Sequence, residues 1–542
     1  MKIVEGNLID VVNREIYPCA ITISEGKIVS IERNSNSYNC YISPGLVDSH
    51  VHVESSMLLP TEFSRLAIAN GTVAIVSDPH EIANVVGKEG IYFMLEDAKN
   101  TPLKCFWGIP SCVPATPFDR AGAKLSAKDT EELAKTGLFS HLSEMMNVPG
   151  VLNNDDEVLR KLAVAKKYNL CVDGHCPGLR GDDLSDYITK GVGTDHEAYT
   201  LEEAEEKISK GMYIQIREGS AARNYDALKS LIATNTERVM FCTDDSHADD
   251  LLQQGHINKI VKKALADGFG IFDILQVACM NPVHFYHLDV GTLQIGDAAD
   301  FIIVDDIDTF NILSVYINGE EVFHSGGKVK LKDSEKKYIN YFVREPIHEN
   351  EICLPVQGDV CCIKIIPDSL VTDKKVISFP ERIDNFQVSL NDDVLKLVYL
   401  NRYFNGTPQM GLISGLNLKE GAFATSISHD SHNIIAVGTN DADLTAAINA
   451  VIREKGGLAL CKGKESYVLP LPIAGIMTDK SGEEVAEQYL FLKKKLKEWG
   501  CTLKAPFMTL SFMGLVVIPA LKIGEKGLFD TEKFDFIKSY GN

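Results

Sequence analysis

The sequence predicts a TIM-type (β/α)₈ barrel that carries a small β domain and a C-terminal α/β or α+β domain. Strand-like and helix-like segments alternate over residues 42–287, which is the pattern of a parallel sheet wrapped by helices. Two β-rich segments flank this region, and after residue 332 the regular alternation of strand-like and helix-like segments does not continue. A chain of 542 residues is also too long for one hydrophobic core, since domains usually hold about 100–200 residues.

The two flanking segments, residues 1–41 and 288–332, are expected to form one small β domain. Runs of apolar and β-branched residues at 3–5, 16–23 and 27–31 are separated by turn residues, which is typical of short strands. The later segment shows the same pattern of short apolar runs separated by turn residues, in GTLQIGDAADFIIVDD and SVYINGEEVFHSGG. One β domain that brackets the barrel in sequence is the simplest interpretation.

The middle region, residues 42–287, supplies eight candidate strands. Helices are expected between them, for example at 61–70, 87–98, 157–168 and 201–210. A doubly wound sheet is the alternative, but the sequence has no Walker A motif and no GxGxxG after a strand, so no nucleotide-binding motif supports it. The expected strands are residues 46–53, 72–77, 103–109, 138–143, 170–174, 191–195, 212–216 and 239–243.

Residues 333–542 are expected to form a separate C-terminal domain. A run of charged residues at its start is typical of a linker. Strand-like segments at 371–378 and 394–400 are then mixed with helical segments at 443–454 and 482–499. This mixture indicates an α/β or α+β domain.

The composition argues against several classes of protein. The 54 Lys and Arg residues face 75 Asp and Glu residues, which gives a formal net charge of −21. Nucleic acids and anionic membranes require clustered basic residues, so we expect neither as a partner. The N-terminal residues do not form the basic and apolar run of a signal peptide. The 13 cysteines show no CxxC pair, which favours reduced thiols in a cytoplasmic protein.

The sharpest local signal is PGLVDSHVHVESS, which contains His50 and His52. Residues two apart on a strand point to the same face, so both imidazoles can chelate one cation. Two ordinary histidines near a strand end are the alternative, and the motif alone does not decide between them.

Groups that bind metals recur where other expected strands end. Strand ends meet at the C-terminal mouth of a barrel, where active sites of this fold form, and a cation there would offset the gathered charge. Histidine and carboxylate without cysteine suit Mn²⁺, Fe²⁺ or Zn²⁺. The number of ligands favours two ions about 3.5–4 Å apart, bridged by a carboxylate. The groups are Asp78, His80, Glu144, His175, Asp195, His196, Glu197, Asp244 and Asp245.

This pattern resembles the amidohydrolase superfamily over roughly residues 1–330. The resemblance implies ligands from the HxH of the first strand, a bridging group on the fourth, histidines on the fifth and sixth, and an aspartate on the eighth. Many members bridge the metals with a carboxylated lysine. Here the fourth strand ends in Glu144 with no lysine beside it, which counts against the dihydroorotase and hydantoinase branches. The implied ligands are His50, His52, Glu144, His175, His196 and Asp244.

Longer motifs resemble one branch of this superfamily, the adenine deaminases. They are HVHVESSML, SDPHEIANVVG, GHCPGL, IREGSAARN and TDDSHADDLLQQGHI, followed by HDSHNIIAVGTND and LPLPIAGIM. The resemblance spans nearly the whole chain, and it is weakest over residues 333–391. It implies a purine base as the small-molecule partner: adenine is hydrolysed to hypoxanthine and ammonia, in purine salvage, by a hydroxide that the metal ions generate.

We expect further residues at the barrel mouth to take part. Asp244 takes the proton of the attacking water and delivers it to the leaving amine, and Glu144 and Glu218 are the other expected catalytic residues. The alternatives are an Arg217–Glu218 ion pair that is purely structural and a Ser220 that only caps a helix. The expected substrate contacts are Glu54, Ser55, His80, Arg217 and Ser220.

Two histidines of HDSHN, His429 and His432, lie far along the chain from the barrel. They either close over the barrel mouth, bind another ion, or belong to an exposed loop. His80 follows Pro79, so a plain turn is the alternative to a substrate contact there.

Two rival functions stay open. One is an amidohydrolase that acts on another aminopurine or a cyclic amide, and the other is a catalytically silent scaffold. Cytidine deaminases also carry an HxE triplet like His52–Glu54, but the PCxxC that completes their zinc site is missing from the sequence. We expect a homo-oligomer, namely a dimer.

Overall fold

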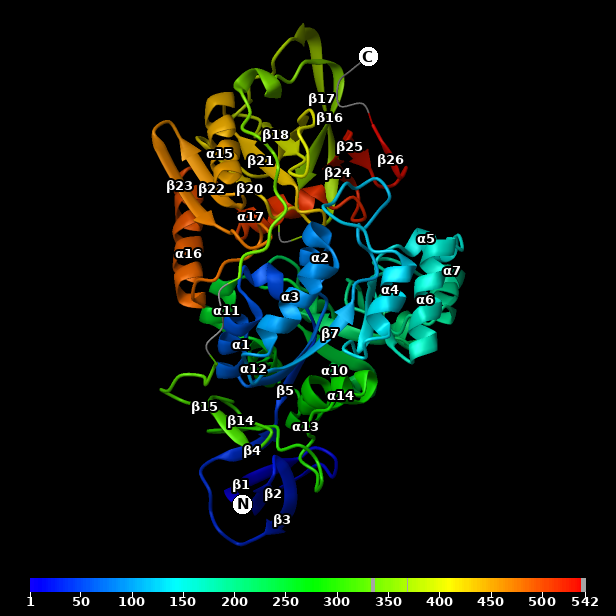
Figure 1. Ribbon diagram of the computed structural model, residues 1–542, viewed down its shortest axis with the longest axis vertical. Helices are drawn as coiled ribbons and strands as arrows, with labels where there is room; N and C mark the ends of the chain where they lie inside the picture. Colours follow the sequence, from blue (N-terminus) through cyan, green and yellow to red (C-terminus); the bar gives the residue numbers. More distant parts are fainter. Residues whose placement is uncertain (333–336, 368, 538–542) are drawn as a thin grey trace.

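The computed structural model describes residues 1–332, 337–367 and 369–537. Figure 1 shows three parts along the long axis: a small β sheet at one end, a barrel in the middle and a C-terminal part at the other end. The charged run expected as a linker begins at residues 333–336, which lie outside the described residues.

A closed ring of eight parallel strands forms the barrel and confirms the expected fold class. The strands are β5 (Leu46–Val51), β6 (Thr72–Ser77), β7 (Lys104–Ile109), β8 (His141–Met145), β9 (Cys171–Gly174), β10 (Thr194–Asp195), β11 (Tyr213–Arg217) and β12 (Val239–Cys242). β5 to β9 are hydrogen-bonded in sequence order, as are β10 to β12. Gly193 N–H donates to Val172 O at 2.9 Å to join the two groups, and Asp244 N–H donates to His50 O at 2.9 Å to close the ring.

The barrel strands are apolar because they are covered on both sides. Every residue of β5, β6, β8 and β12 is buried, as expected for parallel strands with side chains inside the ring and helices outside it. The outer helices are α1 (Pro60–Ala69), α2 (His80–Val86), α3 (Lys88–Ala98), α4 (Ala127–Ala134), α5 (Val148–Leu152), α6 (Asp156–Tyr168), α7 (Gly181–Thr189), α8 (Leu201–Ser209), α9 (Tyr225–Leu228), α10 (Leu231–Thr234), α11 (Ala248–Gln254), α12 (Ile257–Ala266), α13 (Ile271–Leu275) and α14 (Asn281–Tyr286).

Segments from both flanks of the barrel build the small sheet. Its strands are β1 (Lys2–Asp10), β2 (Glu15–Ser24), β3 (Lys27–Arg33), β4 (Tyr41–Pro44), β13 (Phe301–Val304), β14 (Ile312–Ile317) and β15 (Glu320–His324). They follow the order β15-β14-β13-β4-β1-β2-β3. β4 leads directly into β5, so the small sheet lies at the end where the barrel strands begin (Figure 1). The opposite end, where the strands finish, faces the C-terminal part.

The C-terminal part is a mixed α and β structure. Its strands are β16 (Val356–Ile365), β17 (Thr372–Ile383), β18 (Leu395–Leu400), β19 (Gln409–Ser414), β20 (Ala422–Thr425), β21 (Ile434–Gly438), β22 (Gly457–Lys462), β23 (Glu465–Pro470), β24 (Leu521–Gly524), β25 (Gly527–Asp530) and β26 (Asp535–Phe536). The first eight form one sheet in the order β17-β16-β19-β18-β21-β20-β22-β23, and the last three form a second sheet. Its helices are α15 (Asp441–Arg453), α16 (Gly482–Glu498) and α17 (Pro506–Ser511).

Helix α16 attaches the C-terminal part to the barrel. The Lys493 ammonium lies 2.9 Å from Oδ2 of Asp249 in α11, and Arg65 of α1 pairs with Glu483. These contacts place the C-terminal part over the barrel mouth. Among the described residues, no helix has both the length and the apolar character that crossing a bilayer requires.

Candidate metal centre

The end of β5 brings two imidazoles into the barrel mouth. His50 lies inside the strand and His52 directly after it, both almost fully buried. Because alternate residues share a face, both rings point inward, with centroids 4.8 Å apart. The ring of His196, which follows β10, stacks on that of His50 at a centroid distance of 4.2 Å.

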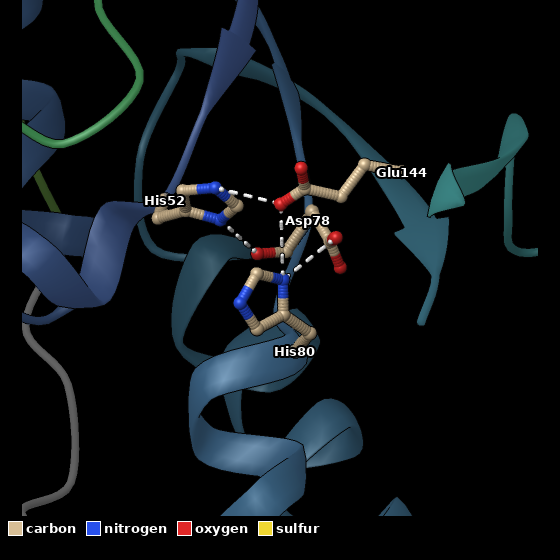
Figure 2. A group of neighbouring side chains, drawn as sticks. All are labelled: His52, Asp78, His80 and Glu144. Carbon is tan, nitrogen blue, oxygen red and sulfur yellow. Dashed lines mark hydrogen bonds and ion pairs between the residues drawn. The ribbon is translucent and has the colours of Figure 1, made fainter. Parts of the chain in front are cut away.

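Glu144, in β8, presents its two carboxylate oxygens to different histidines. Oε1 lies 3.2 Å from Nε2 of His52, while Oε2 lies 2.8 Å from Nδ1 of His175 and 3.4 Å from Nε2 of His196. Figure 2 shows Glu144 reaching toward His52 and His80. One carboxylate therefore stands between two groups of imidazoles, which is the position of a bridging ligand.

Asp244 closes the other side of this group. Its Oδ1 lies 3.1 Å from Nε2 of His52 and 3.5 Å from Nε2 of His50, while Oδ2 accepts a hydrogen bond of 2.6 Å from Arg217. Burial alone would raise the pKa of Asp244, but the Arg217 charge and the nearby imidazoles of His50 and His52 hold it well below its usual range. Asp244 is therefore a carboxylate and not a carboxylic acid.

Several buried nitrogens in this group have no hydrogen-bond partner among the described residues. They are both ring nitrogens of His50, Nε2 of His175 and Nδ1 of His196. Burial and the neighbouring His50 lower the pKa of His196 to about 4, which leaves it neutral, as a metal ligand must be. Unpaired imidazole nitrogens beside two carboxylates fit a divalent metal ion. Ligand atoms of His50, His196 and Asp244, and of Glu144, His175 and His196, lie within 4.8 Å of one another in each group.

His80, at the start of α2, lies beside this group. Its Nδ1 is 2.8 Å from Oδ2 of Asp78 and 3.5 Å from Oε1 of Glu144 (Figure 2). Its Nε2 points the other way, 3.7 Å from Oδ1 of Asp430 in the C-terminal part. His80 therefore lines the barrel mouth and is not simply part of a turn at Pro79.

Two of the expected site residues lie outside the mouth. Glu218 is the next residue after Arg217, so its side chain points to the opposite side of the strand and lies 3.5 Å from Nζ of Lys263 in α12. The Ser220 hydroxyl donates to Asp250 at 2.5 Å. The catalytic role of Glu218 and the substrate contact of Ser220 find no support in this geometry.

The described residues do not show the plain alternatives for these residues either. Arg217 pairs with Glu197 and Asp244, so it forms no structural pair with Glu218. Asn224, not Ser220, occupies the position before the next helix, α9.

Glu54 and Ser55 are buried and do not line the pocket. The Ser55 hydroxyl is 2.8 Å from Oε1 of Glu81 and 2.5 Å from Oδ1 of Asp245, so it fixes two carboxylates that do face the pocket. Burial and the neighbouring Glu81 raise the pKa of Glu54 to about 8. We therefore regard both as supporting residues and not as substrate contacts.

A pocket lies beside the metal ligands. The barrel and the C-terminal part both line it, so His429 does lie over the barrel mouth. The exposed-loop alternative is wrong, since His429 and His432 are buried. Several residues that line the pocket, among them Glu81 and Asp430, do not stand at an expected strand end. The barrel contributes His52, His80, Glu81, Glu144, Met146, His175, His196, Glu197, Arg217, Asp244 and Asp245, and the C-terminal part contributes Leu370, His429, Asp430, Phe512, Leu515 and Ile518.

Comparisons with known proteins agree with this architecture. The model of the amidohydrolase family matches residues 41–322, and that of the adenine deaminase C-terminal domain matches residues 369–535. A beta-aspartyl dipeptidase from Fervidobacterium islandicum superposes with a TM-score of only 0.46 at 16% identity, covering 62% of this chain and 98% of that one. This structural likeness is too weak to show the family of the chain, which sequence relatives show instead.

Those relatives match along their full length. A protein named adenine deaminase from Methanosarcina acetivorans is 47% identical over 100% of both chains. One with the same name from Sulfurovum is 46% identical over 99% of each, and one from Borreliella burgdorferi is 43% identical over 98% of this chain and 99% of that one. The chain belongs to the adenine deaminase family of the amidohydrolases.

Proposed function

We propose that this chain hydrolyses adenine to hypoxanthine and ammonia at a centre of two divalent ions. The observation that carries the proposal is Glu144, whose two oxygens face separate groups of imidazoles. Mn²⁺ and Fe²⁺ are the first candidates, with Zn²⁺ as the third, because the donors are imidazoles and carboxylates. Such ions, when bound, lower the pKa of a water molecule toward neutrality.

Residues of the protein itself carry out the proton transfers. Arg217 holds one oxygen of Asp244 and leaves Oδ1 directed toward His50 and His52. There the carboxylate takes a proton from the water that attacks C6 of adenine. It then delivers this proton to the amine as the C6–N bond breaks and ammonia leaves.

The pocket suits a small neutral base. Leu370, Phe512, Leu515 and Ile518 form an apolar side, and carboxylates and histidines form the polar side. A planar heterocycle requires apolar contact and a few fixed polar groups. Adenine carries no phosphate, so the pocket does not need the cluster of basic residues that a nucleotide would require.

The rival functions have less support. Glu144, in place of a bridging lysine, counts against the cyclic-amide branches. Buried imidazole nitrogens without partners are costly unless something binds them, and a silent scaffold would have no use for them. The dimer and the cytoplasmic location stay predictions.

A purine panel tests the proposal. The protein is purified with Mn²⁺ or Fe²⁺, and ammonia release is measured with adenine, adenosine, other aminopurines and cytosine. We expect hypoxanthine from adenine, with adenosine and cytosine far slower. A kcat/KM for adenosine close to that for adenine would contradict a free-base pocket, and turnover of another aminopurine alone would favour the rival amidohydrolase.

A further inference from the structure

The Asp430 carboxylate lines the pocket from the C-terminal part, and one of its oxygens has no hydrogen-bond partner among the described residues. Asp430 is 5% exposed, and the oxygen without a partner is Oδ2. Its Oδ1 lies 3.7 Å from Nε2 of His80, which is too far for a hydrogen bond. Oδ1 also lies 3.8 Å from Nδ1 of His429, so only Oδ2 is left without a partner. A buried polar atom without a hydrogen bond is costly, so Oδ2 is suited to a donor that arrives with a ligand.

The loop that carries Asp430 is held firmly in place. The Asn433 amide donates to Arg120 O of the barrel at 3.1 Å and to the Tyr399 hydroxyl at 2.8 Å, and the His429 N–H donates to Ser511 O at 3.2 Å. The ring of His429 also stacks on Phe512, with centroids 4.2 Å apart. Asp430 is therefore positioned before any ligand binds, which lowers the entropic cost of a contact.

Asp430 and the metal centre lie on opposite sides of one imidazole. His80 approaches Glu144 through Nδ1, at 3.5 Å, and Asp430 through Nε2, at 3.7 Å. In a purine, C6 and the N9–H group lie at opposite ends of the fused rings. A purine with C6 at the metal centre can therefore direct N9–H toward Asp430.

We propose that Asp430 accepts a hydrogen bond from N9–H of the purine and thereby selects the free base over N9-substituted purines. This inference rests on the proposed function and adds a binding subsite to it. A nucleoside has no hydrogen on N9, so it would leave the buried carboxylate unpaired as well as requiring room for the sugar. Sites built around one hydrogen bond reject analogues that lack it for this reason.

The test compares adenine with 9-methyladenine, which lacks the N9 hydrogen but keeps C6 and its amine. We expect the wild-type protein to favour adenine in kcat/KM by about 10–100-fold, the range for a hydrogen bond to a charged group. In Asp430→Ala the value for adenine should fall by that factor while the value for 9-methyladenine stays level or rises. Metal content should not change, because Asp430 does not lie among the expected ligands.

Asp430→Asn provides a second variant if the alanine variant does not fold, and the same loss of preference is expected from it. Asp119→Asn is the matched control. Asp119 lies near enough for Asp430 to add to the burial that raises its pKa to about 7, but its carboxylate accepts from Thr116 and does not line the pocket. This control should keep the preference of the wild type.

A wild-type protein that processes both bases equally, or Asp430 variants that keep the wild-type preference, would overturn the subsite. If the wild type does not turn over adenine, the proposed function fails. The subsite is then judged by calorimetry on the Mn²⁺-loaded protein, where adenine should bind about 10–100-fold more tightly than 9-methyladenine, and equal affinities would overturn it.

Discussion

Nη1 of Arg217 donates a hydrogen bond of 2.6 Å to Oδ2 of Asp244, and both side chains are buried. The guanidinium keeps the Asp244 carboxyl ionised although burial opposes the charge. It also fixes which oxygen faces the histidines. The pair thus prepares a carboxylate that both contacts the metal centre and accepts a proton, and these two tasks can be separated experimentally.

Asp244→Asn keeps the size of the side chain and one oxygen but cannot accept a proton. General acid–base residues typically contribute about 10²–10⁴ in rate, so kcat should fall by that order with much of the metal retained. The measurement is kcat against pH for the Mn²⁺-saturated variant, which should also lose the acidic limb. A wild-type rate at full metal occupancy would remove Asp244 from proton transfer and direct attention to Asp245.

Arg217→Met removes the charge that holds the pKa of Asp244 down. Burial is then unopposed by that cation, so the pKa rises and Asp244 stays protonated up to a higher pH. Because the protonated form cannot act as a base, the acidic limb of the kcat profile should move to higher pH. Arg238→Met, at an exposed arginine, is the control, and an unmoved limb in the Arg217 variant would contradict this account.

Lys522 gives a prediction about stability. Its side chain is fully buried and donates to Leu370 O at 2.8 Å, and burial lowers its pKa to about 7. A lysine in the unfolded chain has a pKa of about 10.4. Between these values the unfolded state binds more protons, so the stability contribution of this group improves as pH rises through that range and is worst below pH 7.

Lys522→Met should therefore raise the urea midpoint of unfolding at pH 6, and the gain should shrink between pH 7 and about pH 10. Lys526→Met, at an exposed residue in the turn between β24 and β25, should show no such dependence. A gain that is independent of pH would mean that the effect comes from packing and not from the ammonium charge.

The strands of the barrel could be predicted well because burial on both faces leaves a clear apolar run. β6 has the expected bounds, and β7, β9 and β12 differ from expectation by one residue at one end. β8 begins at His141, three residues later than expected, because the segment 138–140 precedes the pairing with β7. Leu138 and Phe139 are apolar, so the apolar pattern alone does not separate this loop from the strand that follows it.

The site could be predicted only where a residue lies at the end of a strand or just after it. His50, His52, Glu144 and Asp244 do so and converge at the mouth. Glu218 also follows a strand, but its neighbour Arg217 takes the inward position, and strict alternation could have excluded it.

Asp430 and Phe512 could not be found in this way. They reach the pocket only because the C-terminal part packs over the barrel, and no local pattern in the sequence encodes that docking. Glu81 lies one residue after His80 on α2, and its orientation toward the pocket depends on Ser55 and His429 from other segments.

Metal titration of the apoprotein tests the central claim most directly. Metal is removed with a chelator, Mn²⁺ is added in steps, and hypoxanthine formation from adenine is measured at each step. We expect no activity without metal and a rise that ends at two equivalents, with Glu144→Ala folded but unable to retain the metal or the activity. Full activity at one equivalent, turnover without metal, or normal metal content and turnover in Glu144→Ala would contradict the account.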